Sequence, residues 1–223
     1  MQVFTINQIT THVLCNTPQC FAEVRTLAPG EAIAPAAAEV TLCVIEGSVD
    51  LGAIGILDAM TGVQIPAGYT WHGAAGTSGA KVLRVDSPHP DFDAAQRLIV
   101  PLTAPHRFAV AGGQMMVYDD YVRGGVLTFA PGFIADKHFH DGADEIFWFF
   151  QGQCRVTGPY EEVVLDAGNI VLTPANEWHI IANAGSQPLL MFLTVTPNVV
   201  PSHTFFDADG KPYARSMLPL TKA

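Results

Sequence analysis

Short apolar segments recur along the chain and are separated by turn residues, which constrains the fold more than any other feature. They are rich in Val, Ile, Leu and Phe, and Gly, Pro, Asn or Asp bound them. The segments are residues 39–47, 80–88, 124–132, 144–152, 168–178 and 188–197. The chain has 20 Gly and 16 Pro, as many closely spaced turns require. Runs of this length and spacing predict an all-β sandwich or barrel.

The chain also repeats itself weakly. Residues 27–49 are similar to residues 129–156, and turn residues recur at offsets of 105, 108 and 109 positions. The pairs are Gly47 with Gly152, Pro66 with Pro174, and Pro88 with Pro197. An internal duplication of one β unit explains this pattern. We therefore expect two domains, over residues 1–98 and 99–223.

Composition and charge exclude several classes of partner. Eleven Lys plus Arg against 21 Asp plus Glu give a formal net charge of −10, which disfavours binding to nucleic acid or to anionic membranes. The start of the chain lacks the pattern of a signal peptide, and no apolar run is long enough for a membrane helix. We expect a cytoplasmic protein whose four cysteines are reduced.

Four side chains in the second copy suit a metal ion. His138 and His140 stand at positions i and i+2, which on a strand places both side chains on one face. Glu145 follows after a short turn, and His179 lies further along. Three imidazoles and one carboxylate suit a divalent first-row transition metal, and they leave coordination positions free for water, substrate or dioxygen. The pattern therefore predicts a reactive metal site.

These residues resemble the two motifs of the cupin superfamily. The first motif is Gly132, five residues, His138, one residue, His140, four residues, Glu145, six residues and Gly152. The second is Gly168, five residues, Pro174, two residues, Glu177, Trp178, His179, three residues and Asn183. Asn176 stands where the second motif usually has glycine. The resemblance implies a bicupin, that is, two tandem jelly-roll (double-stranded β-helix) barrels.

The first copy lacks this ligand set. Aligning the copies puts Ala36, Ala38 and Val40 where the two histidines and the glutamate would be. His72 is one residue away from the fourth ligand position, beside Trp71. Alkyl groups cannot coordinate a cation, so we expect one metal ion per chain, in the second barrel. Its identity among Fe, Mn, Ni, Cu, Zn and Co is left open, because all accept these donors.

Strand alternation predicts the environment of the metal. If Glu145 faces the barrel interior, Phe147 and Phe149 face it too, either lining a dry substrate pocket or filling the core. We add Ile181 and Asn183 to the expected pocket. The opposite face, Ile146, Trp148 and Phe150, is too apolar for water, so another sheet, the first barrel or a second subunit should cover it. A homodimer is expected.

Cupins with this ligand set have several functions, and two of them are weakened by single residues. Oxalate-acting cupins typically have an arginine where this chain has Ala135, and dimethylsulfoniopropionate lyases have a tyrosine where it has Phe147. The resemblance favours a dioxygenase that cleaves a ring or C–C bond of a small apolar or aromatic substrate, with Glu145 as the proton acceptor. The alternatives are an oxygen-independent isomerase, epimerase or lyase, and a non-catalytic sensor or ligand-binding protein.

Overall fold

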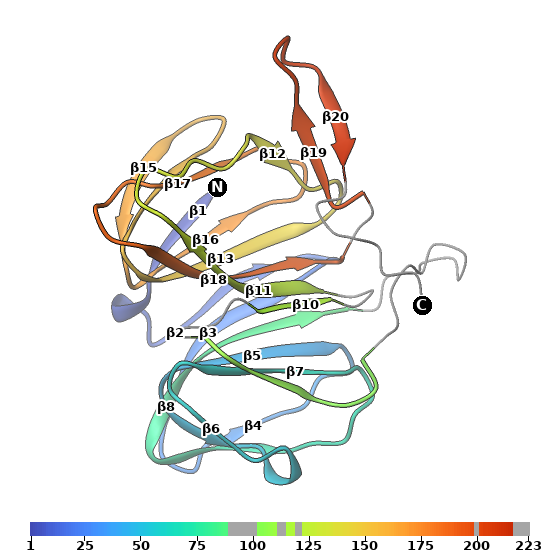
Figure 1. The fold of residues 1–223 in the computed structure, drawn as a ribbon. Helices are drawn as coiled ribbons and strands as arrows, with labels where there is room; N and C mark the ends of the chain where they lie inside the picture. Colours follow the sequence, from blue (N-terminus) through green and yellow to red (C-terminus); the bar gives the residue numbers. More distant parts are fainter. Residues whose placement is uncertain (89–101, 111–114, 119–121, 199–200, 216–223) are drawn as a thin grey trace. The chain divides into compact units, whose positions relative to one another are not determined.

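The computed structural model describes residues 1–88, 102–110, 115–118, 122–198 and 201–215 (Figure 1). Regular structure within these residues is β-strand, apart from two single-turn 3-10 helices, η1 (Ile6–Gln8) and η2 (Gly52–Ile54). The predicted all-β fold class is confirmed. No helix in this part of the chain is long and apolar enough to cross a membrane.

Contacts divide the chain into two compact units. The described residues of the N-terminal unit lie in 7–88 and 102–110, and those of the C-terminal unit in 1–6 and in the ranges from 115 to 215. The N-terminal unit has an antiparallel sheet of order β2-β3-β8-β5-β7-β9, with β4 paired to β8 and β6 to β5. Its strands are β2 (Thr11–Asn16), β3 (Phe21–Leu27), β4 (Ala32–Ile33), β5 (Glu39–Asp50), β6 (Ile56–Asp58), β7 (Thr61–Ile65), β8 (Gly73–Ser87) and β9 (His106–Ala109).

The C-terminal unit has one large sheet, of order β1-β16-β13-β18-β11-β10, and two three-stranded sheets, β12-β19-β20 and β15-β14-β17. The strands of the large sheet are β1 (Gln2–Thr5), β10 (Met115–Tyr118), β11 (Arg123–Phe129), β13 (Asp144–Gln151), β16 (Asn169–Thr173) and β18 (Leu189–Thr196). The smaller sheets contain β12 (His138–Phe139), β14 (Gln153–Thr157), β15 (Glu162–Asp166), β17 (Ile180–Asn183), β19 (His203–Phe206) and β20 (Pro212–Arg215).

The two large sheets have the same strand order, as the predicted duplication requires. The order β2-β3-β8-β5-β7-β9 in one corresponds to β10-β11-β18-β13-β16-β1 in the other. One edge strand of each sheet comes from outside the segment predicted for it. Strand β1, at the start of the chain, pairs with β16 of the C-terminal unit, and β9, after residue 98, pairs with β7 of the N-terminal unit. The contact-based units therefore differ from the predicted segments 1–98 and 99–223 in these two strands, because each edge strand completes the sheet that it pairs with.

The predicted alternation along β13 is observed. Phe147 and Phe149 belong to the core cluster of the C-terminal unit, together with Cys154, Val171, Ile181 and Met191. Ile146 and Trp148 are buried but lie outside this cluster, and Phe150 is half-buried. The outward face is thus largely covered, and the homodimer stays a prediction.

Equivalent glycines in the two copies show why the repeat keeps them. Gly47 and Gly152 both have positive φ, +74° and +84°. A Cβ on Gly47 would collide with the Gly79 carbonyl oxygen, and one on Gly152 would lie 2.7 Å from the Pro188 carbonyl oxygen. Both positions therefore need glycine for two reasons, the left-handed backbone and the close approach of a neighbouring strand.

Gly152→Ala should destabilise the protein more than Gly168→Ala. Gly168 has a similar φ, +91°, but nothing lies within 4 Å of its added Cβ. We expect Gly168→Ala to cost about 1–2 kcal/mol in free energy of unfolding, from the backbone alone. Gly152→Ala should cost about 1–3 kcal/mol more, because the methyl group also displaces backbone. Equal losses in denaturant titrations would show that the close approach has no energetic weight.

Candidate metal centre

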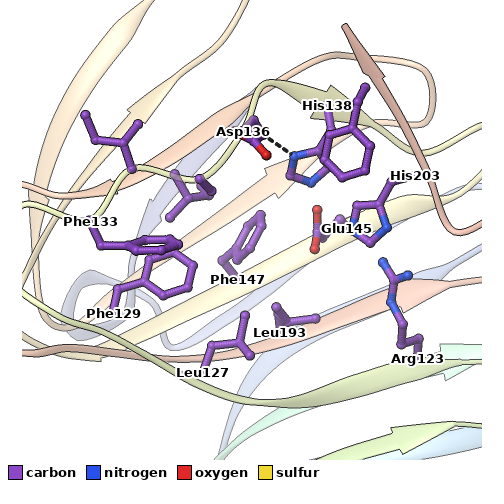
Figure 2. A pocket seen from close by; sticks show the side chains of 14 residues that line it. Arg123, Leu127, Phe129, Phe133, Asp136, His138, Glu145, Phe147, Leu193 and His203 are labelled. Carbon is purple, nitrogen blue, oxygen red and sulfur yellow. Dashed lines mark hydrogen bonds between the residues drawn. The ribbon is translucent and has the colours of Figure 1, made fainter. Parts of the chain in front are cut away.

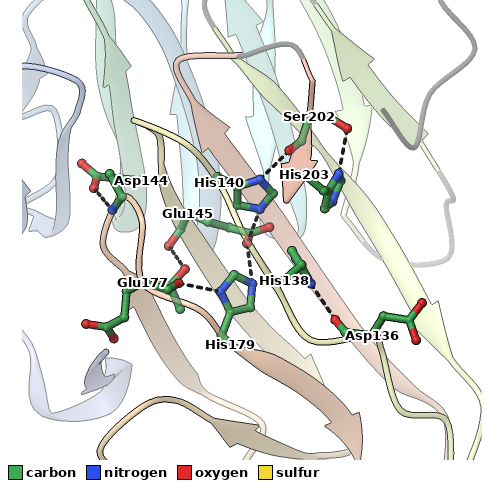
Figure 3. A network of polar contacts seen from close by, with 11 residues as sticks. Asp136, His138, His140, Asp144, Glu145, Glu177, His179, Ser202 and His203 are labelled. Atoms are coloured by element: carbon green, nitrogen blue, oxygen red, sulfur yellow. Dashed lines mark hydrogen bonds and ion pairs between the residues drawn. The ribbon is translucent and has the colours of Figure 1, made fainter. Parts of the chain in front are cut away.

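The four residues predicted as ligands converge in the C-terminal unit. Glu145 comes from β13 of the large sheet, whereas His138, His140 and His179 come from β12, the residue after it and the residue before β17. One donor atom from each lies within 4.8 Å of those of the others. All four side chains are at least 92% buried, since their exposed fractions are 8% or less. Figure 3 shows the three imidazoles grouped around the Glu145 carboxylate.

Backbone pairing positions the histidines. His138 and His179 form an isolated antiparallel bridge in which each backbone N–H donates to the other's carbonyl, at 3.2 and 2.9 Å. Their side chains therefore share one face, with ring centroids 4.4 Å apart. Asn176 adopts φ +67° in the turn before His179, so it takes the left-handed conformation that glycine usually has there. The departure from the second motif therefore leaves the ligand position unchanged.

The Nδ1 atoms of all three histidines face backbone carbonyl oxygens. His138 Nδ1 lies 2.8 Å from Asp136 O, His140 Nδ1 2.6 Å from Ser202 O, and His179 Nδ1 3.4 Å from Glu177 O. A carbonyl oxygen can only accept, so each Nδ1 must carry the proton. In the neutral imidazole the lone pair is then on Nε2, the tautomer in which Nε2 is the metal donor.

The Nε2 atoms of His140 and His179 both lie 2.9 Å from the same oxygen, Glu145 Oε2. The His140 contact is a hydrogen bond if Nε2 carries a proton, whereas the Nε2 of His179 is a buried polar atom without a hydrogen-bond partner. A lone pair facing a carboxylate oxygen at this distance is repulsive unless positive charge lies between them. Two ligands about 2.1 Å from one metal ion, at a right angle, are about 3.0 Å apart. The donor set therefore fits a divalent cation.

Burial and neighbouring charges set the protonation states. Burial, with help from the His179 imidazole, lowers the pKa of His138 to about 3. Burial alone would raise the pKa of Glu145, but hydrogen-bond donation and positive charge from His140 and His179, which act when these rings are protonated and no metal is bound, hold that pKa well below its usual value. A neutral imidazole and an ionised carboxylate are the forms that bind metal.

A cavity of about 490 Å³ adjoins the cluster, and His138 and Glu145 form part of its wall (Figure 2). Of the four predicted pocket residues, Phe147 and Ile181 line it. Phe149 does not, because it is fully buried in the core. Asn183 does not line it either: its amide donates to the carbonyls of Phe129 and Gln187, and its oxygen accepts from the Gly185 N–H. These contacts hold the loop after β17.

Besides the exposed Asp136, two polar residues of the cavity wall were not predicted from the sequence. Arg123 begins β11 and is 3% exposed, and His203 begins β19. The His203 ring lies 4.8 Å from that of His138 and 4.7 Å from that of His140. Burial, and then the charge of Arg123, lower the pKa of His203 to about 2. Neither residue falls within the two motifs, so motif spacing gave no signal for them.

In the N-terminal unit, the positions equivalent to the predicted metal ligands carry alkyl side chains. Val40 is 1% exposed in that unit's core cluster, and Ala36 packs against the same cluster. His72 is exposed, while the neighbouring Trp71 is buried in the core. Ala36 and Ala38 also line a cavity of about 500 Å³ in this unit, but the alkyl side chains at the three positions offer no metal donor.

Comparison with known proteins agrees with this geometry. Residues 125–196 match the family model described as a cupin domain. This range contains all four predicted ligands. No curated protein sequence matches the chain.

Solved structures match over most of the chain. A cupin 2 conserved barrel domain protein from Leptotrichia buccalis superposes with TM-score 0.64 at 15% identity, over 87% of this chain and 96% of its own. A putative glyoxylate-induced protein from Pseudomonas aeruginosa gives 0.66 at 15% identity, over 84% and 80%. Oxalate decarboxylase from Bacillus subtilis, which has Mn(II) centres, gives 0.56 at 14% identity, over 87% and 76%. At such identities the likeness establishes the fold alone, which is the cupin fold.

We expect one equivalent of divalent metal per chain, lost when two of the four donors are removed. His138→Ala combined with His140→Ala should leave less than about a tenth of an equivalent, because a carboxylate and one imidazole bind far more weakly than four donors. The exposed His72 provides the control, since His72→Ala should keep full loading. Elemental analysis of protein purified without a histidine tag measures this. Two equivalents in the unchanged protein, or full loading of the double variant, would contradict the assignment.

Proposed function

We propose that the chain is a metal-dependent enzyme that uses dioxygen to cleave a C–C bond of a small, largely apolar organic substrate. The observation that carries this proposal is the position of the donor cluster: it adjoins a mainly apolar cavity of about 490 Å³, and two of its members, His138 and Glu145, lie in the cavity wall. His138, His140, Glu145 and His179 would hold one ion of Fe, Mn, Ni, Cu, Zn or Co.

The cavity supports a small organic substrate. Its volume lies within the usual range for small-molecule sites, about 300–1,000 Å³. Leu127, Phe129, Phe147, Ile181 and Leu193 supply apolar wall. A dry wall strengthens the electrostatic effect of the ligands on a bound molecule and keeps water from reacting in the substrate's place.

The metal, when bound, supplies Lewis acidity toward a substrate oxygen and open coordination positions for dioxygen. Glu145 and His138 both belong to the cluster and to the cavity wall, and Glu145 supplies the carboxylate oxygens that would accept a substrate proton. A carboxylate is a weak base, so it suits a substrate whose proton the bound metal would make acidic, such as that of an enol or phenol. An enol, a phenol or a 1,3-diketone is therefore the substrate type that suits this carboxylate.

An oxygen electrode survey of enols, phenols and diketones, with metal-loaded protein, tests the proposal. Oxygen consumption in proportion to substrate loss is the expected result. Turnover that continues unchanged without oxygen would replace the proposal with an isomerase, epimerase or lyase. Tight binding without turnover of any compound would replace it with a sensor or binding protein.

Glu145→Gln and His179→Ala should separate proton transfer from metal binding. Gln keeps the shape and one oxygen donor, so we expect a substantial part of the metal to remain while turnover falls about 100-fold or more. His179→Ala should lose metal and activity together, because it removes one of the four donors that would hold the ion. Metal content and rate are measured on the same samples. Full activity of the fully loaded Gln variant would remove Glu145 from the proton-transfer step.

A further inference from the structure

The cavity beside the donor cluster has two chemically different ends (Figure 2). At one end the rings of Phe129 and Phe133 pack with centroids 4.3 Å apart. At the other, the guanidinium of Arg123 is directed toward His203 and Glu145. The cavity therefore suits a molecule with one apolar and one polar end.

Arg123 places a permanent positive charge in this wall. Its side chain is 3% exposed, and a guanidinium stays protonated in proteins. It has five N–H donors in a planar fork that matches the two oxygens of a carboxylate. Such a fork can bind a carboxylate through some donors while others contact protein groups, so a ligand site here does not require Arg123 to lack protein partners.

The charges around the polar end favour an anion. Besides the histidines, the ionisable side chains lining the cavity are Arg123, Glu145 and Asp136. Asp136 is exposed, so solvent screens its charge. With a divalent metal bound, Arg123 and the metal contribute three positive charges against the one negative charge of Glu145. The excess attracts a negatively charged group of a ligand.

The apolar end is open to solvent. Phe133 and Ile134 line the cavity and are 46% and 63% exposed, which is unusual for large apolar side chains beside a pocket. Apolar groups at a cavity mouth gain free energy when a ligand covers them. The body of the ligand should therefore be apolar or aromatic and should contact the apolar side chains at this end of the cavity.

We propose that the ligand of this cavity is a carboxylic acid with an apolar or aromatic body, whose carboxylate binds Arg123 while the body packs against Phe129 and Phe133. The inference rests on the proposed function in one respect, that the same cavity holds the substrate. It narrows the substrate class to organic acids and makes Arg123 the residue that selects them.

Calorimetric titration of the full-length protein with matched ligands tests the inference. The probes are 3-phenylpropanoate, its neutral amide 3-phenylpropanamide, and acetate, each with metal-free and with Zn²⁺-loaded protein. The metal-free arm removes direct coordination of the carboxylate by the ion. We expect the acid to bind at least about 10-fold more tightly than the amide in both arms, as a charge-assisted bidentate pair does. Acetate should bind more weakly than 3-phenylpropanoate, because it cannot contact the aromatic pair.

Variants of Arg123 identify the group responsible. Arg123→Gln should abolish the preference for the acid, whereas Arg155→Gln, at a half-exposed arginine of the same unit, should keep it. Arg123→Lys keeps the positive charge but lacks the planar guanidinium, so it should reduce the preference for the acid over the amide several-fold. This variant tests the role of Arg123 if the Gln variant does not fold. Equal binding of acid and amide by the unchanged protein, or an unchanged preference in a folded Arg123 variant, overturns the inference.

The outcome is separate from that of the proposed function. Acid binding through Arg123 by a protein that consumes no oxygen would support this inference and overturn the dioxygen chemistry. Oxygen-dependent turnover of neutral substrates, with equal affinity for acid and amide, would overturn only the assignment of Arg123.

Discussion

Three backbone carbonyls determine what the candidate centre can bind. By accepting from the Nδ1 atoms of His138, His140 and His179, they place the Nε2 lone pairs in one small volume against Glu145. Two of these carbonyls are local, since Asp136 and Glu177 each lie two residues before their own histidine, whereas Ser202 is 62 residues from His140. Local backbone geometry therefore orients His138 and His179, and tertiary structure orients His140.

The two large sheets share one strand order but enclose different interiors. They also share a positive-φ glycine at Gly47 and Gly152. In the N-terminal unit, Val40 and the residues around it fill the core with alkyl groups. In the C-terminal unit, Glu145 and the histidines occupy the corresponding positions and a cavity remains beside them. The backbone provides the scaffold, and a few side chains at the sheet interior decide whether it holds packed apolar groups or a cluster of potential metal ligands.

Local sequence predicted the parts of the site that depend on local geometry. The i, i+2 spacing of His138 and His140 and the alternation of β13 correctly placed side chains on faces, because both follow from strand geometry. Facing inward did not suffice to predict which residue meets the cavity: Phe147 lines it, and Phe149, two residues on, is sealed in the core. Asn183 matches the motif, yet its side-chain amide does not reach the cavity and donates to the backbone carbonyls of Phe129 and Gln187.

Features that depend on tertiary pairing were missed. Arg123 and His203 reach the cavity from β11 and β19, outside both motifs, and no periodicity in the sequence connects them with His138. The pairing of β1 with the C-terminal unit was not predicted either, because β1 and β16 are more than 160 residues apart in the chain. Register between distant strands is set by the folded sheet as a whole.

We expect the three imidazoles to present Nε2, with Nδ1 protonated, to one divalent cation. Long-range ¹H–¹⁵N correlation spectra of ¹⁵N-histidine-labelled protein, recorded during titration with diamagnetic Zn²⁺, distinguish the two nitrogens of each ring. The Nε2 resonances of His138, His140 and His179 should shift together and reach their end point at one equivalent, while their Nδ1 resonances keep the values of protonated nitrogens. Zn²⁺-dependent loss of the Nδ1 protons, or spectra of these three residues that do not respond to Zn²⁺, would contradict this expectation.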